Sequence, residues 1–260
     1  MSKLASSGLC CFMKCNCFNS IMYADDLIIL SISLLHLQSL VDICVHEFKS
    51  IGMSINLLAC LRVGPRHAAV CQPIIIDQVP LKWVQEIKYL GIYLLSGKGF
   101  SFNLQPVKQK FFKALNGIFG KIGLKTSPAV LCSLINSYCV PILIYAAEAL
   151  DWSKKLLNSL ENAYANVFYK IFNSYDKKII TQCQFYTGCL PMHLLLDLRK
   201  LTFFAKICTK AYYYHPLQHL VKWTNSEYDI LCDKYGFGSN VNVNSLKFRM
   251  FQYFESVAFA

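Results

Sequence analysis

The chain is poor in acidic residues, and one long stretch has none at all. Only 15 of its 260 residues are Asp or Glu, against 26 Lys plus Arg, so the formal net charge is +11. The interval between Lys88 and Glu148 contains no acid, whereas its lysines are Lys98, Lys108, Lys110, Lys113, Lys121 and Lys125. A local positive field of this kind attracts phosphate backbones, although a solvated basic face would give the same pattern.

Charged residues are also scarce overall, at 16% of the chain, while hydrophobic residues make up 55%. This balance excludes intrinsic disorder and supplies more apolar surface than one compact domain of this size usually needs. Either a missing partner surface or a membrane would account for the excess. The length allows one large domain or two small ones.

No unbroken run of about 20 apolar residues is present, which is the length that a transmembrane helix requires. The most apolar stretches, 27–40 and 129–150, both contain polar residues, and the second also contains Pro141 and Glu148. The N-terminus lacks the charged and apolar blocks of a signal peptide. We therefore expect an intracellular protein of the cytoplasm or nucleus, neither secreted nor inserted in a membrane.

Cys-x2-Cys pairs, the usual frame of a zinc site, are absent although the chain has 13 cysteines. Four of them cluster near the N-terminus, at Cys10, Cys11, Cys15 and Cys17, without a neighbouring His. An odd total without a secretory signal favours reduced, buried thiols over a disulfide framework or a structural metal.

Hydrophobic patterning predicts an α+β fold in which strands precede helices. Residues 18–30 place two acids between short apolar runs, which predicts strand, tight turn and strand. Apolar residues at steps of three and four then predict an amphipathic helix over 34–51, stopped by Gly52. Further short strands are expected at 53–55, 74–76 and 82–95. Gly64-Pro65 and Pro80 should break the chain between these strands.

Beyond residue 96 the pattern changes from strands to helices, so residues 96–105 are the expected domain boundary. Apolar side chains in the first helical segment, 107–124, cover one arc, and Lys110, Lys113 and Lys121 lie on the opposite arc. One face should pack and the other should be basic. Further helices are expected at 128–139, 153–172 and 191–212, and the tail over 225–244 is too mixed to assign.

Asp25 and Asp26 are the candidate catalytic and metal-binding residues. Adjacent aspartates on a regular strand point to opposite faces, but at the tip of a hairpin both can approach one point. Carboxylates suit Mg²⁺, and two such ions can promote the in-line attack of a hydroxyl on a phosphate. A turn that uses Asp for its own backbone hydrogen bonds would have the same sequence.

An ordered set of motifs resembles the reverse transcriptases of non-LTR, LINE-like retrotransposons over roughly residues 5–200. Tyr-Ala-Asp-Asp at 23–26 resembles the catalytic hairpin of these enzymes, and the segment 83–92, with Tyr-Leu-Gly at 89–91, resembles their primer-grip hairpin. Other blocks occur in the same order: Gly-Leu-Cys at 8–10, Gly-Met-Ser-Ile-Asn at 52–56, Gly-Pro-Arg at 64–66 and the apolar segment 139–148, which resembles thumb helices. The ordered set is far more specific than any single motif.

The resemblance implies a partial polymerase palm, made of antiparallel hairpins plus one helix, in residues 1–100. A helical thumb would follow in 101–175 and an unassigned helical extension in 176–260. Asp25 would ligate catalytic Mg²⁺, supported by Asp26, and the primer end would lie near Tyr23, Ala24, Tyr89, Leu90 and Gly91. The implied partners are an RNA template and a DNA primer, without a defined protein partner. Their backbone would be held by Lys108, Lys110, Lys113, Lys121 and Lys125.

Two departures from the family pattern bear on activity. The palm needs a further metal-binding aspartate on an earlier strand, yet the 22 residues before Tyr23 contain no Asp or Glu. The family lysine that is thought to protonate the leaving pyrophosphate has no counterpart in 57–63. We also expect no endonuclease domain and no fingers region, which would hold the incoming nucleotide, within these 260 residues.

We therefore expect a truncated RNA-directed DNA polymerase that is inactive as this chain. The alternative is a binding module in which palm and thumb still hold nucleic acid without chemistry. A membrane protein built on the two apolar stretches is a third hypothesis.

Overall fold

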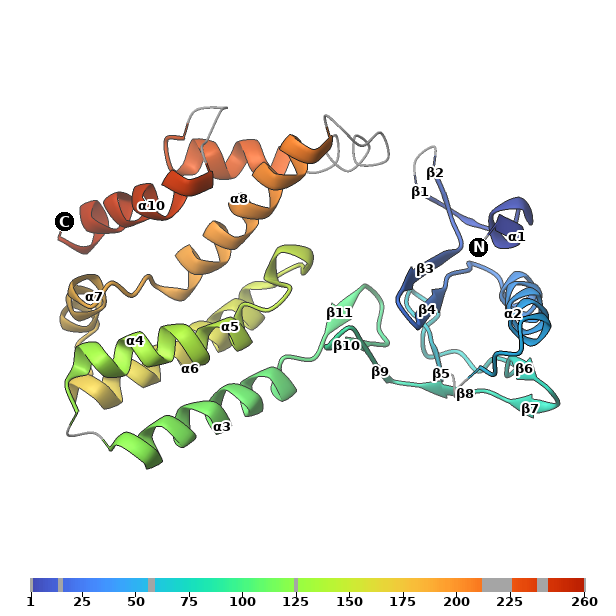
Figure 1. Cartoon of the computed structure of the whole chain (residues 1–260), viewed down its shortest axis with the longest axis horizontal. Helices are drawn as coiled ribbons and strands as arrows, with labels where there is room; N and C mark the ends of the chain where they lie inside the picture. The colour runs from blue at the N-terminus through green and yellow to red at the C-terminus, as the bar shows by residue number, and fades with distance from the viewer. Residues whose placement is uncertain are drawn as a thin grey trace. The chain divides into compact units, whose positions relative to one another are not determined.

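The computed structural model describes residues 2–13, 16–55, 59–123, 126–211, 226–237 and 243–259. The fold is α+β, and the chain divides into two compact units, Met1–Asn103 and Leu104–Ala260 (Figure 1). This division falls within the expected interval 96–105. Strands occupy the first unit and helices the second, and the second unit includes both the segment up to 175 and the extension beyond it.

The first unit is built from small sheets and two helices. Its helices are α1 (Ser2–Ser6) and α2 (Leu34–Ser50). Its strands are β1 (Cys11–Met13), β2 (Asn16–Phe18), β3 (Ser20–Tyr23), β4 (Asp26–Ile29), β5 (Ala59–Leu61), β6 (Ile75–Ile76), β7 (Val79–Pro80), β8 (Lys82–Val84), β9 (Glu86–Tyr89), β10 (Ile92–Leu95) and β11 (Ser101–Phe102). The sheets pair β1 with β2, β3 with β4, β5 with β8, β6 with β7, and β9 with β10 and β11.

Helix α2 forms as its pattern predicts, and it holds the core of the first unit. Leu40 and Cys44 lie one turn apart on its buried face and pack with Leu4 of α1. Leu27 and Ile29 of strand β4 pack against the same cluster. Gly52 follows the helix with a φ of 73°, a left-handed conformation that glycine adopts without a steric cost.

Three strand predictions for this unit need correction. Residues 53–55 form no strand, because their backbone has no pairing partner among the described residues. Pro80 does not break the chain but ends strand β7 opposite Ile75, a position at the edge of a two-stranded sheet that a proline tolerates. The β5–β8 pair is parallel, whereas only antiparallel hairpins were expected.

The first unit buries few large side chains. Its buried hydrophobic residues are Leu4, Cys10, Leu40, Val41, Cys44, Ile74 and Phe102. More large apolar side chains of the unit are exposed: Phe12, Phe18, Ile21, Met22, Tyr23, Ile32, Leu35, Ile51, Met53, Val63, Val70, Ile75, Val79 and Phe100. Exposed apolar surface on this scale is typical of a face that another element or chain covers.

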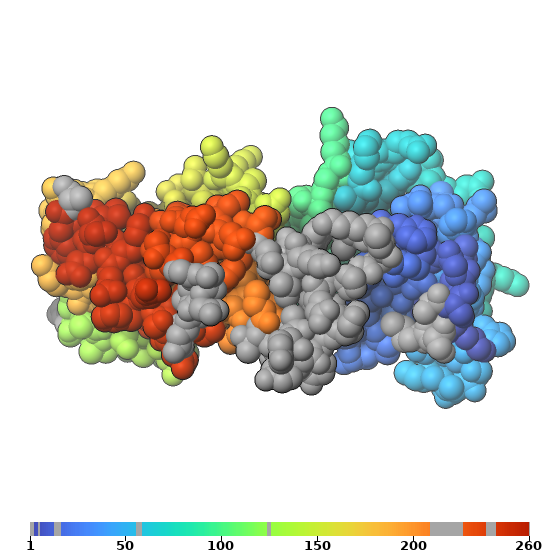
Figure 2. Space-filling view, turned by 90° about the horizontal axis from the view of Figure 1, so that it is seen from above, coloured from blue at the N-terminus to red at the C-terminus, as the bar shows by residue number. Residues whose placement is uncertain are grey.

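The second unit is helical and well packed. Its elements are α3 (Gln105–Ile122), α4 (Pro128–Tyr138), α5 (Val140–Leu143), η1 (Ala147–Ala149), α6 (Lys154–Phe172), α7 (Lys177–Tyr186), α8 (Met192–Ala211), a helix over 226–234 and α10 (Val243–Ala258). The helices predicted at 107–124, 128–139, 153–172 and 191–212 are thereby confirmed. A large core joins α8, the helix 226–234 and α10, whose surfaces adjoin in the space-filling view (Figure 2).

The most apolar helical stretch of the second unit runs from Pro128 to Ala149. It is long and apolar enough to cross a membrane, and 33% of its most apolar window is buried within the protein. The stretch is not one continuous helix, because it consists of α4, α5 and η1, with Ala146 in a left-handed conformation before η1. Core helices of soluble proteins have the same composition, so the stretch is weak support for a membrane.

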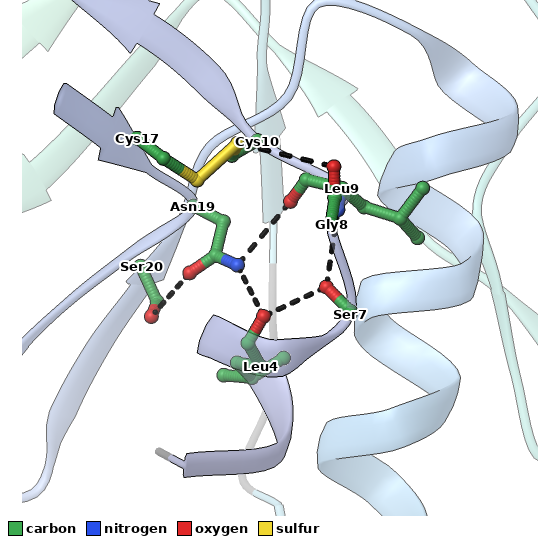
Figure 3. The surroundings of a disulfide bond; sticks show 8 residues. All are labelled: Leu4, Ser7, Gly8, Leu9, Cys10, Cys17, Asn19 and Ser20. Atoms are coloured by element: carbon green, nitrogen blue, oxygen red, sulfur yellow. Dashed lines mark hydrogen bonds between the residues drawn. A yellow bond between two sulfur atoms is a disulfide. The ribbon is translucent and has the colours of Figure 1, made fainter. Parts of the chain in front are cut away.

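Cys10 and Cys17 form a disulfide (Figure 3), which corrects the expectation that the N-terminal thiols are reduced. The pairing joins the residue before β1 to the middle of β2, two positions that the β1–β2 hairpin already brings together. Cys15 lies outside the described residues. Five other cysteines are buried as free thiols, which agrees with the expectation: Cys44, Cys132, Cys139, Cys189 and Cys232.

Candidate nucleic-acid site

Asp25 and Asp26 lie at the tip of the β3–β4 hairpin, as the sequence pattern predicts. Tyr23 pairs with Asp26, so Ala24 and Asp25 form a two-residue turn, and Ile21 pairs with Ile28 on the flanking strands. Ala24 has a φ of 53°, the positive value that two-residue hairpin turns require at their first position. Glycine is favoured there, so alanine holds the turn at a cost of about 1–2 kcal/mol.

The tip of this hairpin is open to solvent. Both aspartates are exposed, and Tyr23 is 65% exposed. Among the described residues, strand β3 has β4 as its only strand neighbour, and Ile21 and Met22 on it are about half exposed, at 48% and 46%. The other side of the hairpin packs on α2 through Leu27 and Ile29. The turn is therefore held from one side only.

Asn19 fixes the base of the same hairpin, a role that the sequence alone did not reveal. Its side chain is 7% exposed, and its amide Nδ2 donates to the carbonyl oxygens of Leu4, at 2.6 Å, and Leu9, at 3.2 Å (Figure 3). The backbone carbonyl oxygen of Asn19 accepts a hydrogen bond from the backbone N–H of Leu30 at 2.7 Å. A single Asn before an apolar strand is compatible with many turn or loop roles, so no sequence signal marked Asn19 as a residue that braces the hairpin.

Tyr89, Leu90 and Gly91 form a second hairpin, between β9 and β10. Tyr89 pairs with Ile92, and Leu90 and Gly91 form the two-residue turn, with φ values of 45° and 84°. Positive φ at both turn positions is typical of a type I′ hairpin. The Tyr89 hydroxyl oxygen is buried without a hydrogen-bond partner among the described residues, so the tyrosine ring packs inward. This hairpin and the β3–β4 hairpin belong to the same unit but to separate sheets.

Helix α3 carries the basic face that was expected. Phe111 and Leu115 are buried on one side, and Lys110, Lys113 and Lys121 are exposed on the other. No ion pair of these three lysines is found in the described part of the chain. Their positive charge is therefore available to a ligand.

Two other lysines that were predicted to bind nucleic acid do not join this face. Lys108 is partly buried, and its ammonium Nζ donates to the hydroxyl Oγ of Ser159 on α6 at 3.1 Å. It sits on the packed side of α3 because it lies one turn before the buried Phe111. Lys125 lies outside the described residues.

The two aspartates do not by themselves make a polymerase metal centre. Within the described ranges, no group of three or more His, Cys, Asp or Glu side chains is placed to hold a metal ion. Mg²⁺ in phosphoryl-transfer sites takes carboxylates plus substrate phosphates, and a two-metal centre needs carboxylates from more than one strand. Two adjacent carboxylates on one exposed turn do not fit that requirement, so we derive no polymerisation step from them.

Comparison of the chain with family models, with curated proteins and with solved structures gives no match.

Proposed function

We propose that this chain is the palm and thumb portion of a reverse transcriptase of the non-LTR retrotransposon type, which holds a primed template but does not extend it alone. The observation that carries the proposal is the Tyr23–Asp26 hairpin. It presents two neighbouring carboxylates and a tyrosine at an exposed two-residue turn, braced from behind by α2. The Tyr89–Gly91 hairpin follows later in the same unit, which is the order that the family resemblance implies.

The exposed apolar surface of the first unit supports the same proposal. A palm hairpin is normally part of a wider sheet, whereas no further described strand pairs with β3 here, and Ile21, Met22 and Tyr23 are exposed. Unpaired, apolar strand edges are usually covered by another strand or helix. In the proposed polymerase, the strand that bears the remaining metal-binding aspartate would provide this cover.

The alternative, a binding module without chemistry, is favoured by helix α3. The exposed lysines 110, 113 and 121 share one face, and the surrounding interval of the chain contains no acid to neutralise them. Lysines in this arrangement contact phosphates without reading the bases. The two proposals differ only in whether the hairpin ever takes part in catalysis.

An incorporation assay with the purified chain tests what both proposals predict, namely binding without extension. A DNA primer annealed to an RNA template should bind, and no deoxynucleotide should be added in Mg²⁺ or Mn²⁺, because the described residues place no third metal-binding side chain beside Asp25 and Asp26. Incorporation that disappears in Asp25→Ala would show that the chain has a complete metal site. Absence of binding to any nucleic acid would contradict both proposals.

A further inference from the structure

Two buried thiols, Cys132 and Cys189, meet in the core of the second unit. Cys132 lies on α4, and Cys189 lies in the connection between α7 and α8. Each is 1% exposed, and neither belongs to a disulfide. The Cys132 thiol donates a hydrogen bond to the Cys189 sulfur, so the two sulfur atoms lie next to each other. Nothing in the proposed polymerase function uses this pair.

The end of α7 places Cys189 at this point. Gly188, after the helix, has a φ of 68°. The backbone N–H of Cys189 donates to the carbonyl oxygen of Gln184 at 2.8 Å, and that of Gly188 donates to Phe185 at 3.0 Å. These two bonds form a Schellman motif, which reverses the chain and often directs the residue after the glycine back against the helix. The Cys189 side chain is thereby turned into the core.

A second hydrogen bond is directed at the Cys189 sulfur. The amide Nδ2 of Asn136 donates to it at 3.1 Å. Asn136 follows Cys132 by about one helical turn, so both donors share one face of α4. The hydroxyl of Tyr164, on α6, donates to the Asn136 oxygen Oδ1 at 3.4 Å and leaves the amide nitrogen to the sulfur. The protonated Cys189 thiol donates to the Thr187 carbonyl oxygen at the longer distance of 3.7 Å. Two donors that converge on one sulfur favour its thiolate.

The surroundings divide the roles of the two thiols. The hydrogen bond from Cys132 is the largest cause that lowers the pKa of Cys189 below its ordinary value of 9.0, although burial acts in the opposite direction. The same hydrogen bond, and then burial, raise the pKa of Cys132. Other ionisable groups that act on the pair are Tyr164 on α6, Cys183 on α7 and Lys247 on α10. Cys189 is therefore prepared to attack as a thiolate, while Cys132 keeps its proton.

We propose that Cys189 and Cys132 form a peroxide-reactive dithiol, in which Cys189 is oxidised first and Cys132 then closes a disulfide with it. The Cys189 thiolate attacks one oxygen of hydrogen peroxide, so a sulfur–oxygen bond forms and the oxygen–oxygen bond breaks. The hydroxide that leaves takes up the proton that Cys189 had released. The Cys132 sulfur then attacks the Cys189 sulfur, and the oxygen leaves with the Cys132 proton as water. The two thiols lose two electrons, the peroxide gains them, and two water molecules are released.

The α7–α8 connection gives a small oxidant a route to the pair. Gly188, adjacent to Cys189, is exposed, and a Cβ atom at this position would meet no described atom within 4 Å. Hydrogen peroxide has two heavy atoms and needs only a small opening there. A bulky disulfide such as glutathione disulfide does not fit beside a cysteine that is 1% exposed. The burial of the pair thus restricts the oxidant to a small peroxide.

The order of oxidation among the cysteines tests the proposal on the full chain. Cys183 is the natural comparison, because it acts on the same pair from α7 and is more exposed than Cys189. Exposure alone predicts that Cys183 is oxidised first, whereas the two donors predict Cys189. At pH 7 we expect hydrogen peroxide to oxidise Cys189 at least about 5-fold faster, as measured by alkylation of the remaining thiols and mass spectrometry. Equal rates, or faster oxidation of Cys183, would overturn the proposal.

Peptide mapping identifies the bond that forms. Trypsin should release Cys132 within residues 126–154 and Cys189 within residues 179–199, and each peptide contains one other cysteine. After peroxide treatment, fragment masses should place the new disulfide between Cys132 and Cys189. A bond through the other cysteine of either peptide would contradict the assignment. Glutathione disulfide should add no glutathione to Cys189, and a mixed disulfide there would overturn the restriction to a small peroxide.

Two substitutions assign the roles of the neighbours. Cys132→Ser should leave Cys189 as a sulfenic acid, which dimedone traps, in place of a disulfide. Asn136→Ala should slow the oxidation of Cys189 about 3- to 10-fold, because the sulfur loses a donor. Asn158→Ala is the matched control, since it removes the same side chain from an exposed position on α6 and should leave the rate unchanged. Equal rates in the two asparagine variants would contradict the role of Asn136. Circular dichroism checks that each variant is folded, and the comparison of Cys189 with Cys183 in the wild type needs no variant.

Discussion

Tyr23 and Asp26 face each other as the last paired residues of the β3–β4 hairpin, with only Ala24 and Asp25 between them. This pairing brings the two carboxylates and the tyrosine to one exposed tip. A helix over the same residues would have separated the aspartates by 100° around its axis. The hairpin is the structural feature that makes a shared role of Asp25 and Asp26 chemically reasonable.

The conformation of Ala24 gives a local test of this turn. Ala24→Gly should remove the steric cost of positive φ and stabilise the hairpin by about 0.5–1 kcal/mol, after the larger entropy loss of glycine is subtracted. Ala24→Val should destabilise it by more than about 1 kcal/mol, since branched side chains rarely adopt this φ. Hydrogen exchange of the amides of Ile21 and Ile28, which form a hydrogen-bonded pair of the hairpin, measures both changes. Shifts of the same sign in the two variants would contradict the turn geometry.

The lysines of α3 should give a salt-dependent affinity for nucleic acid. If Lys110, Lys113 and Lys121 contact about three phosphates, the slope of log affinity against log salt should be about −2 to −3. Substitution of all three by Ala should flatten the slope, as measured by fluorescence anisotropy. The matched control is Lys154, Lys155 and Lys178→Ala, which removes the same charge from other exposed positions. Equal slopes in the two triple variants would assign binding to net charge alone.

The disulfide can be tested by peptide mapping. Lys14 lies between Cys10 and Cys17, so trypsin should place the two cysteines in the separate peptides 4–14 and 15–49. After free thiols are alkylated, these peptides should remain joined until a reductant is added. Cys17→Ser should abolish the disulfide-linked pair of peptides. Because the disulfide joins residues seven positions apart, the loop-closure entropy predicts that its loss lowers the free energy of unfolding by about 2–3 kcal/mol. A digest without the linked pair of peptides would contradict the disulfide and show that Cys10 and Cys17 are reduced.

Alkaline pH should destabilise the second unit through Tyr235. Burial, and then the hydrogen bond from its hydroxyl to the Asp197 carboxylate, raise the pKa of Tyr235 above its ordinary value of 10.0. The stability that this tyrosine provides is therefore full below pH 10 and is lost as the pH rises, because the unfolded chain releases the proton first. The free energy of unfolding should fall by up to about 1.4 kcal/mol per pH unit for this group.

Tyr235→Phe isolates that contribution. The variant should lose about 1 kcal/mol near neutral pH, because Asp197 loses one of its donors, and it should show a shallower decline above pH 10. Urea unfolding followed by circular dichroism across this pH range measures both effects. A decline as steep as that of the wild type would show that other groups dominate the alkaline transition.

The sequence patterns predicted the features that depend on neighbouring residues. The acids between two apolar runs predicted the β3–β4 hairpin, and the spacing of apolar residues predicted α2 and the basic face of α3. These patterns reflect pairing and packing within about twenty residues, and local backbone geometry determines them. The change from strands to helices near residue 100 was visible for the same reason.

Features that depend on distant residues were not predictable. The parallel pairing of β5 with β8 joins segments separated by a long connection, and the contact of Lys108 with Ser159 depends on how α3 packs on α6. The packing of α10 on α7 likewise needs two helices that are far apart in the sequence. The pairing of Cys10 with Cys17 could not be chosen from the spacings, because the cluster permits several pairings.

Photocrosslinking from defined primer positions tests the central proposal most directly. A primer that carries 4-thiothymidine at its 3′ end is annealed to an RNA template, bound to the chain and irradiated, and the crosslinked peptides are identified by mass spectrometry. The palm and thumb account predicts that the 3′ end crosslinks to peptides containing Tyr23 or Tyr89–Gly91. A thiothymidine placed well inside the duplex should instead crosslink to α3. The same peptides from both positions, or crosslinks to α3 alone, would contradict the assignment of the hairpins to a primer end.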